Sequence, residues 1–497
     1  MADTAPFPMW IGGRPVPAAE GETFASYEPA TGTRLADVPR ATSPDVRAAV
    51  RAARAAFDEG PWPRLRPGER AAVLRRVAGR LAAESARLAE LEVRDTGSTI
   101  RKATHVDVAG AAAAFEWCAW WAESLDTHEP PGPAAEYLHW RPVGVVAAIT
   151  PWNFPLLLAA SRVAPAIAAG NACVLKPASF TSLTSLELGR VAHEAGLPPG
   201  VLNVVTGPGA AVGDELARSP EVDLVTLTGS DGVGEQVRAA AAGAVRLDLG
   251  GKSANVVLDD ADLDHAASGA LWGCFFHNGQ ICMAGARLIA ADPVYDELVA
   301  LLAKRAPLLR LGDPLDPATD LGPLITRQQA RTVRRHVQAA VADGAALRCG
   351  GDGPGVLPAG LDAAAYFRPT VLADVAPDSA AAQEEIFGPV LSVIRVRSDD
   401  EAVAVANGTR YGLSAAVWSG DPRRAAGVAE RLRADTVWIN DYRMVDVTRP
   451  GAPGTAADRH WNRLTNELDH YRRRQRVDAA VDAGRRRRNY DLLSGEI

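Results

Sequence analysis

The chain has 497 residues, a length that suggests two to four domains and is ample for large apolar cores without disulfides. Hydrophobic residues make up 47% and charged residues 23%, which is ordinary for a soluble globular protein. The formal net charge of −7 argues against nucleic acid as the main partner. No apolar run of about 18 residues occurs, so we expect no membrane-spanning helix and no membrane partner.

The cysteines are widely scattered, at positions 118, 173, 274, 282 and 349. No pair has the spacing of metal ligands, so the sequence predicts neither a disulfide framework nor a metal site. The N-terminus lacks the basic and apolar regions of a signal peptide. A cytoplasmic location fits both observations best.

The first predicted elements are helices between residues 43 and 92, a segment rich in Ala, Arg and Leu with helical periodicity. Ser43 is the expected N-cap residue, with Pro44 at the first helical position. We interpret these helices as surface elements that carry no chemistry of their own.

From about residue 138 the pattern changes to short Val-rich runs that alternate with helical stretches. The predicted strands are 143–150, 172–178, 222–230 and 245–251, and the predicted helices are 155–170, 182–196 and 234–243. This alternation is typical of βαβ units and a parallel sheet. Ligands of such sheets bind at the carboxyl ends of the strands, where the polar clusters of this segment fall.

A second α/β pattern follows residue 255. It has predicted helices at 294–306 and 327–345 and predicted strands at 367–375 and 390–398. In the tail, residues 462–477 are charged and are predicted to form a helix. We interpret the arginine run at 485–488 as a solvated end, with an anionic partner as the alternative.

Polar residues follow three of the predicted strands. Asn153 lies between two prolines in PWNFP, so a rigid loop aims its amide where an oxyanion needs a donor, although a plain turn asparagine is the alternative. Lys176 and Ser179 in KPAS supply a cation and a hydroxyl suited to ribose or phosphate. The turn TGSDGVG, 228–234, presents backbone N–H groups to a phosphate, but its spacing is not that of the usual dinucleotide motif.

Two further residues carry reactive groups. Asp248 precedes Gly250 and Gly251 at a strand end, which suits either a mobile base or a turn cap. Cys282 lies in GQICMAG, after an aromatic pair at 275–276. A cysteine is a nucleophile only if it has thiolate character and access, and otherwise it fills a core.

In chain order the segments form one pattern. It consists of PWNFP, LKPAS, LTGS, LDLGGKSANVVLDDAD, FFHNGQICMAGARL, EEIFGPVLSV and NGTRYGLSAAVWSGD. This pattern resembles the aldehyde dehydrogenase superfamily, and the similarity runs from about Trp10 to about Asn440. The resemblance implies an α/β fold with a Rossmann-like cofactor domain, an α/β catalytic domain and a small β oligomerisation element.

The resemblance also implies a mechanism. Cys282 would attack an aldehyde, and the Asn153 side chain and the Cys282 backbone N–H would hold the oxyanion. Hydride would pass to NAD or NADP and leave a thioester, and a base at Asp248 would activate water to release a carboxylic acid. The partner is then a small-molecule aldehyde.

Several residues are assigned to the cofactor by the resemblance alone. Glu385 and Phe387 match the residues that hold the nicotinamide ribose and ring, and Gly209 matches an adenine-side position. The full set implied for NAD or NADP is Thr150, Pro151, Trp152, Lys176, Ser179, Gly209, Thr228, Gly229, Ser230, Val233, Leu249, Gly250, Glu385 and Phe387.

Two departures from the family pattern lead to hypotheses. Asp248 stands where the family usually has Glu, which is longer by about 1.5 Å, and a misplacement of about 1 Å costs on the order of 10²-fold in rate. We therefore expect hydrolysis of the thioester to limit turnover. Ser179 stands where many NAD-preferring members have Glu, which repels a 2′-phosphate, so we expect NADP to be accepted.

A third departure begins after residue 440, where DYRMVDVTRPGAPGTAADRHWN replaces the family stretch that shapes the substrate mouth and subunit interface. Arg443 and Arg449 would face either an anionic aldehyde or solvent, and Ser161 stands where many members carry an aromatic residue. Two alternative functions stay open: a coenzyme A-dependent acyl-transferring dehydrogenase, and a catalytically weakened structural paralogue.

The resemblance divides the chain into three parts. These are a dinucleotide-binding domain (1–125 and 142–252), a catalytic domain (253–440), and an oligomerisation element with the tail (126–141 and 441–497). The segment EYLHWRPVGVV, 136–146, would give an edge strand that pairs across subunits. A homodimer or homotetramer is therefore expected.

Overall fold

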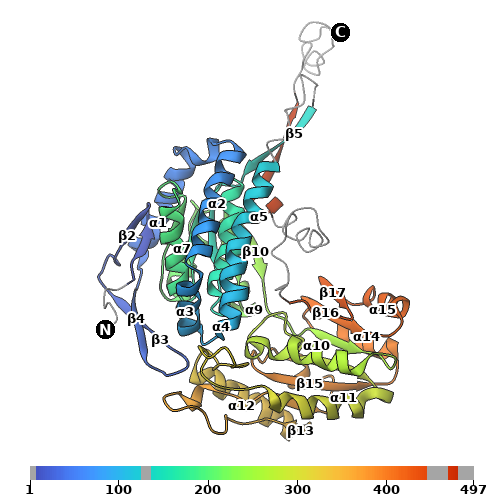
Figure 1. Ribbon diagram of the computed structural model, residues 1–497. Helices are drawn as coiled ribbons and strands as arrows, with labels where there is room; N and C mark the ends of the chain where they lie inside the picture. Colours follow the sequence, from blue (N-terminus) through green and yellow to red (C-terminus); the bar gives the residue numbers. More distant parts are fainter. Residues whose placement is uncertain (1–6, 125–135, 445–467, 479–497) are drawn as a thin grey trace, which may run out of the picture.

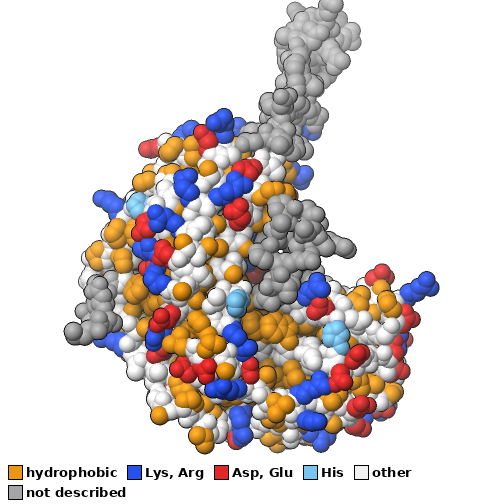
Figure 2. Space-filling view, viewed as in Figure 1, with side chains coloured by type: hydrophobic (Ala, Val, Ile, Leu, Met, Phe, Trp, Pro, Cys, Tyr) orange, Lys and Arg blue, Asp and Glu red, His pale blue; other side chains and the backbone are white. Residues whose placement is uncertain are grey.

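The computed structural model describes residues 7–124, 136–444 and 468–478 (Figure 1). It contains two seven-stranded sheets that follow one another along the chain, a hairpin of β3 (Thr23–Tyr27) with β4 (Arg34–Pro39), and a two-stranded ribbon. Within these residues no helix is long and apolar enough to cross a membrane. Figure 2 shows positive and negative side chains interspersed over one face, without a basic patch.

The first sheet has the strand order β10-β9-β6-β7-β8-β1-β2. Its strands are β1 (Met9–Ile11), β2 (Arg14–Val16), β6 (Val145–Ile149), β7 (Ala172–Lys176), β8 (Leu202–Val204), β9 (Leu224–Thr228) and β10 (Ala244–Asp248). Strands β6 to β10 are parallel, and β1 and β2 add antiparallel strands at one edge. The four strands predicted for this region are confirmed, each within three residues of its expected limits.

Helices cover both faces of this sheet. They are α1 (Ser43–Asp58), α2 (Pro67–Ala83), α3 (Ser85–Thr96), α4 (Ile100–Lys102), α5 (Ala109–Ser124), α6 (Pro155–Ala168), α7 (Leu183–Glu194), α8 (Asp214–Arg218) and α9 (Asp231–Ala240). Alternate residues of β6 enter different cores: Val146 and Ala148 join one cluster, and Val145 and Ala147 join the other. This period of two is why the strand is apolar throughout.

The expected cap of the first helix is shifted by one residue. Helix α1 begins at Ser43, so its N-cap is Thr42 and not Ser43. The backbone N–H of Thr42 donates to the Asp45 carboxylate at 2.9 Å, half of a capping box that the sequence analysis did not consider.

The second sheet has the order β13-β14-β15-β12-β11-β16-β17, parallel except for β13. Its strands are β11 (Ala254–Val257), β12 (Arg287–Ala291), β13 (Ala346–Cys349), β14 (Thr370–Ala373), β15 (Val390–Val396), β16 (Ser414–Trp418) and β17 (Thr436–Ile439). Its larger helices are α10 (Leu263–Phe275), α11 (Asp292–Arg305), α12 (Arg327–Ala342), α14 (Asp399–Asn407) and α15 (Pro422–Ala429). The helices and strands predicted here are confirmed.

The ribbon consists of β5 (Glu136–Pro142) and β18 (Arg472–Asp478), which are antiparallel and which Figure 1 shows projecting away from the body. The helix predicted at 462–477 is therefore wrong for its last six residues, and 462–467 lie outside the described residues. Pairing with β5 overrides the local preference of this arginine-rich segment. The Arg472 guanidinium also lies 4.8 Å from the ring centre of Trp121 and 4.4 Å from that of Trp140.

Candidate active site

The parallel strands of the first sheet bring distant polar residues to one edge. Asn153 follows the end of β6, Lys176 ends β7, Thr228 ends β9 and Asp248 ends β10. These strands are adjacent and point the same way, so their carboxyl ends meet at this edge. Cys282 comes from the other half of the molecule, in the loop between α10 and β12.

Two glycines join the edge of the first sheet to the Cys282 loop. A Cβ atom on Gly251 would lie 2.2 Å from the carbonyl oxygen of Cys282, and one on Gly250 would lie 2.5 Å from Oε2 of Glu385. The backbone N–H of Gly251 donates to Oε1 of Glu385 at 3.2 Å. Only glycine permits this approach, and it places Asp248, Glu385 and Cys282 around one turn.

Cys282 is half-buried, whereas Cys118, Cys173 and Cys274 are buried. Burial, together with the charges of Glu385 and Asp248, raises the pKa of the Cys282 thiol to about 11. The thiol is therefore protonated at neutral pH in the free protein, and a reaction through sulfur requires the thiolate to be stabilised when ligands bind.

Asn153 is buried and faces the same loop. Its side-chain Nδ2 donates to the carbonyl oxygen of Gln280 at 2.8 Å, and Oδ1 has no hydrogen-bond partner among the described residues. Gln280 in turn accepts the backbone N–H of Ile325 at 3.0 Å through Oε1. The Asn153 amide is thus held against Gln280, which stands two residues before Cys282 in the chain.

A buried ion pair supports the loop that carries Asn153. The ammonium group of Lys102 donates to both carboxylate oxygens of Asp107, at 2.9 and 2.7 Å, and to the carbonyl oxygen of Asn153 at 3.4 Å. It also lies 3.9 Å from the ring centre of Phe154. No sequence motif pointed to Lys102, because its partners are set by packing.

Asp248 also has a partner that the sequence analysis missed. Nη2 of Arg162, on α6, donates to Oδ2 of Asp248 and, at 3.0 Å, to Oγ1 of Thr228. Arg162 is a lone charged residue in an otherwise apolar helical run, and that oddity is the one signal that could have found it.

The residues expected to hold the nicotinamide end lie together. Glu385 is half-buried, and burial raises its pKa to about 7. The Phe387 ring lies edge-on to the Trp152 ring, with centres 5.2 Å apart, and Phe387 has a positive φ of 53°. Pro151 precedes Trp152 directly in the chain, just after β6, and Leu249 directly follows β10.

The residues expected to hold the adenosine and phosphates lie farther along the same edge. Lys176 is buried, its ammonium donates to the Pro177 carbonyl oxygen at 2.8 Å, and burial lowers its pKa to about 8. Oγ of Ser179 donates to the carbonyl oxygen of Gly207 at 2.8 Å. Gly209, Gly229, Ser230 and Val233 lie at half-buried or exposed positions, accessible to a ligand.

These groups fit a dinucleotide. The buried hydroxyl of Thr150 has no hydrogen-bond partner among the described residues, although a polar group in a core is normally satisfied. An ammonium, a carboxylate and free hydroxyls at one edge suit phosphates and ribose hydroxyls. The expected residues are therefore placed where a dinucleotide could lie along the strand ends.

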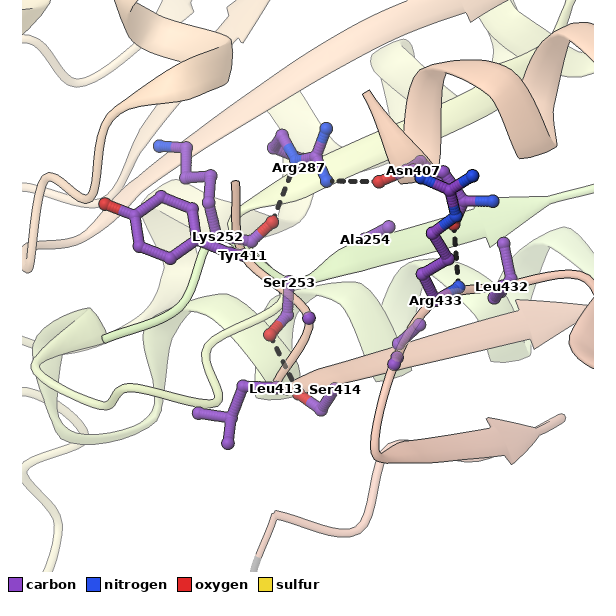
Figure 3. Close-up of a pocket in the computed structure, with 14 residues that line it drawn as sticks. Lys252, Ser253, Ala254, Arg287, Asn407, Tyr411, Leu413, Ser414, Leu432 and Arg433 are labelled. Carbon is purple, nitrogen blue, oxygen red and sulfur yellow. Dashed lines mark hydrogen bonds between the residues drawn. The ribbon is translucent and has the colours of Figure 1, made fainter. Parts of the chain in front are cut away.

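A small cavity behind the Gly251 turn is too tight for a substrate. Its volume of about 10 Å³ is room for one water molecule. Figure 3 shows that Nε of Arg287 donates to the carbonyl oxygen of Lys252, a bond of 2.8 Å, and that Ser253 and Ser414 are joined by their hydroxyls, 2.8 Å apart. These bonds fix the turn that follows Asp248.

The altered tail begins beside the Cys282 loop. The hydroxyl of Tyr442 donates to the carbonyl oxygen of Met283 at 2.8 Å, and its ring closely faces Gly273 and Gly285. Arg443 is exposed and pairs with Asp441, so its guanidinium is already partnered. Arg449 and the 485–488 run lie outside the described residues.

Comparison with known proteins settles the family. Residues 16–454 match the profile of the "Aldehyde dehydrogenase family". The chain belongs to the aldehyde dehydrogenase family. It is 41% identical over 457 residues to the "NADP/NAD-dependent aldehyde dehydrogenase PuuC" of Escherichia coli, covering 89% of each chain.

Solved structures agree. A "NAD-dependent aldehyde dehydrogenase" from Sinorhizobium meliloti has a TM-score of 0.89 at 37% identity, with 98% of this chain and 97% of that chain covered. An "Indole-3-acetaldehyde Dehydrogenase" complexed with NAD+ has a TM-score of 0.87 at 37% identity, with 95% and 96% covered. The predicted fold class is confirmed, and the chain is an NAD(P)-dependent aldehyde dehydrogenase that oxidises an aldehyde to a carboxylic acid.

Proposed function

We propose that Cys282 is the nucleophile of this aldehyde dehydrogenase, with Asn153 as the oxyanion donor and Asp248 as the base that activates water. One observation carries the proposal: the Gly250–Gly251 turn brings the strand end with Asp248 against the backbone of Cys282 and the carboxylate of Glu385. The Asn153 amide reaches the same loop through Gln280.

These side chains account for each bond that forms or breaks in the reaction. The Cys282 thiolate forms a bond to the aldehyde carbon, and the carbonyl oxygen takes the negative charge beside the Asn153 amide. When bound, the nicotinamide ring accepts the hydride. Cys282 then carries a thioester; a water oxygen bonds to the acyl carbon while Asp248 takes a water proton, and the carbon–sulfur bond breaks to return the thiolate.

For the cofactor, we propose that Glu385, Phe387 and Trp152 hold the nicotinamide ribose and ring. Lys176, Ser179 and the remaining strand-end residues would hold the adenosine and phosphates. Because Ser179 is uncharged, no carboxylate at this position repels a 2′-phosphate, and we propose that NADP is accepted as well as NAD. The Escherichia coli relative named for both cofactors supports this choice.

For the architecture, we propose that the first sheet and its helices form the dinucleotide-binding domain, with boundaries 1–125 and 142–252. The second sheet would form the catalytic domain, 253–440. The ribbon of β5 and β18 lies within the segments 126–141 and 441–497 that we assign to oligomerisation. We further propose a cytoplasmic homodimer or homotetramer, a location supported by the free state of all five cysteines.

Rapid mixing tests the function. Aliphatic, aromatic and acidic aldehydes are mixed with NAD and with NADP, and reduced cofactor is followed by absorbance. We expect a burst of about one equivalent per site followed by a slow phase, with the carboxylic acid as product. Stimulation of the slow phase by coenzyme A would instead indicate acyl transfer, and the absence of any signal would contradict aldehyde oxidation by this chain.

Asp248→Glu tests the assignment of the base. The extra methylene restores about 1.5 Å of reach, so the slow phase should accelerate while the burst is unchanged. Asp248→Asn is the matched control and should nearly abolish the slow phase. A glutamate variant with an unchanged or lower steady-state rate would count against hydrolysis as the limiting step.

A further inference from the structure

The Asp248 carboxylate lies between two guanidinium groups. Arg162 reaches it from α6 with a side chain that is 7% exposed, and Nε of Arg246, on β10 itself, lies 4.0 Å from Oδ1. Two other ionisable groups, Cys282 and Glu385, come from separate loops that approach the turn following β10. Two cations therefore face a carboxylate that also neighbours a thiol and another carboxyl group.

Arg162 is itself firmly placed. Its helix begins at Pro155, directly after the Asn153 loop, and its Nη2 bridges the ends of two adjacent strands by donating to Thr228 as well as Asp248. A guanidinium on a rigid element, bonded to both strand ends, leaves the short Asp248 side chain one anchored position.

Building on the proposed function, we propose that Arg162 is the positioning residue for Asp248: it fixes the short carboxylate at the strand end from which it activates water on the Cys282 thioester. Arg162 takes no proton, since a guanidinium stays charged at any physiological pH. The proton passes from water to Asp248 and then to solvent, while the C–S bond breaks.

One measurable consequence follows from this geometry. The charge of Asp248 contributes to the raised pKa of the Cys282 thiol. With Arg162 removed this charge is no longer offset, so Cys282 should alkylate more slowly.

The main variant is Arg162→Gln, which keeps hydrogen bonding but removes the charge. The burst and the slow phase are measured from about pH 5.5 to 9. We expect a burst near one equivalent and a slow phase reduced on the order of 10²-fold, because the carboxylate is no longer held at the strand end. Arg218→Gln, which breaks an exposed Arg–Asp pair on α8, is the matched control and should change neither phase.

Arg162→Lys keeps the positive charge and serves if the glutamine variant does not fold. Its slow phase should be reduced less than that of Arg162→Gln, because an ammonium group can still hold the carboxylate. A slow phase within about twofold of wild type in Arg162→Gln, or an equal loss of the slow phase in both Arg162 variants, would overturn the proposal.

A double-mutant comparison separates positioning from general structural damage. In an Asp248→Asn background, Arg162→Gln should reduce neither the residual slow phase nor the rate of Cys282 alkylation any further. Equal losses in both backgrounds would contradict a role through Asp248. A wild-type protein without a burst would refute the proposed function instead, so the two failures are distinguishable.

Discussion

The Cys282 thiol stands out among the five cysteines because it is half-buried and adjoins two carboxylates. Burial and these charges raise its pKa to about 11, so the free protein holds it as the thiol. Susceptibility to oxidants follows thiolate character, so a cysteine held as the thiol reacts slowly with them. Reactivity of this residue should therefore depend steeply on pH.

Alkylation of the free protein by a small neutral reagent tests this state. The rate at Cys282 should rise about tenfold per pH unit between about pH 7 and 10, because the thiolate fraction rises in proportion. Mass spectrometry of the Cys282 peptide separates it from Cys349, which is also half-buried. A rate that levels off below about pH 8 would show that the thiol is already activated in the free protein.

Ser179 is the residue on which cofactor choice should depend. Its hydroxyl donates to the Gly207 carbonyl oxygen, and it lies three residues after Lys176, the last residue of β7. Ser179→Glu introduces a carboxylate that repels a 2′-phosphate, so kcat/KM for NADP should fall about tenfold or more while that for NAD changes less. Ser179→Gln controls for size and should leave the ratio near the wild-type value; parallel losses with both cofactors would refute the charge argument.

Residue patterns pointed to the proposed reactive residues better than to their supports. Asn153 and Asp248 stood out because each lies in a proline- or glycine-rich loop at a strand end, and Cys282 because it lies in a glycine-containing segment after an aromatic pair. Arg162 and Lys102 did not stand out, since each is a charged residue inside a helical segment. Lys102 pairs with Asp107 only five residues away, but its contact with the Asn153 loop spans 51 residues. The Arg162–Asp248 pair spans 86 residues, and no local periodicity reports such a contact.

At the scale of elements, apolar strands were predictable and the tail was not. Strands such as β6 and β7 are buried on both faces, so their Val-rich runs are distinct from the helices between them. Strand β18 is rich in arginine and became a strand because β5 offers it a partner along seven residue pairs. Local sequence could not predict that pairing.

The buried Lys102–Asp107 pair joins the short helix α4 to the helical turn 103–108 that follows it, and Lys102 also donates to the Asn153 carbonyl oxygen in the loop before α6. Lys102→Met leaves the Asp107 carboxylate uncompensated and should lower the free energy of unfolding by about 3–5 kcal/mol. Urea denaturation followed by tryptophan fluorescence measures the change. In an Asp107→Leu background the same substitution should have a much smaller effect, and an equal effect there would mean that the pair does not support the loop.

At the scale of the whole molecule, the ribbon of β5 and β18 is the feature that indicates contact with another subunit. A two-stranded ribbon is marginal on its own, and among the described residues β5 has no strand on its other edge. We therefore predict that a second copy pairs there. Sedimentation equilibrium at micromolar concentration should give the mass of a dimer or tetramer, and a monomer would contradict the assignment of this segment.

The two halves of the molecule are joined by many contacts, and some of these contacts lie at the site. The Gly251 backbone against Cys282 and the Gly251 bond to Glu385 connect the end of the first sheet to loops of the second. Arg101, on α4, bonds to Thr319 and Asp320 away from the site. The proposed mechanism requires that Cys282 carry the acyl group between hydride transfer and hydrolysis.

The most direct measurement traps that species. Asp248→Asn is mixed with NAD and an aldehyde that gives a burst, then quenched in acid and digested, and the peptides are weighed. We predict that the Cys282 peptide gains the mass of the acyl group minus one hydrogen, in proportion to the reduced cofactor formed, and that Cys282→Ser gains nothing. Reduced cofactor formed without an adduct, or an adduct on another residue, would contradict the account.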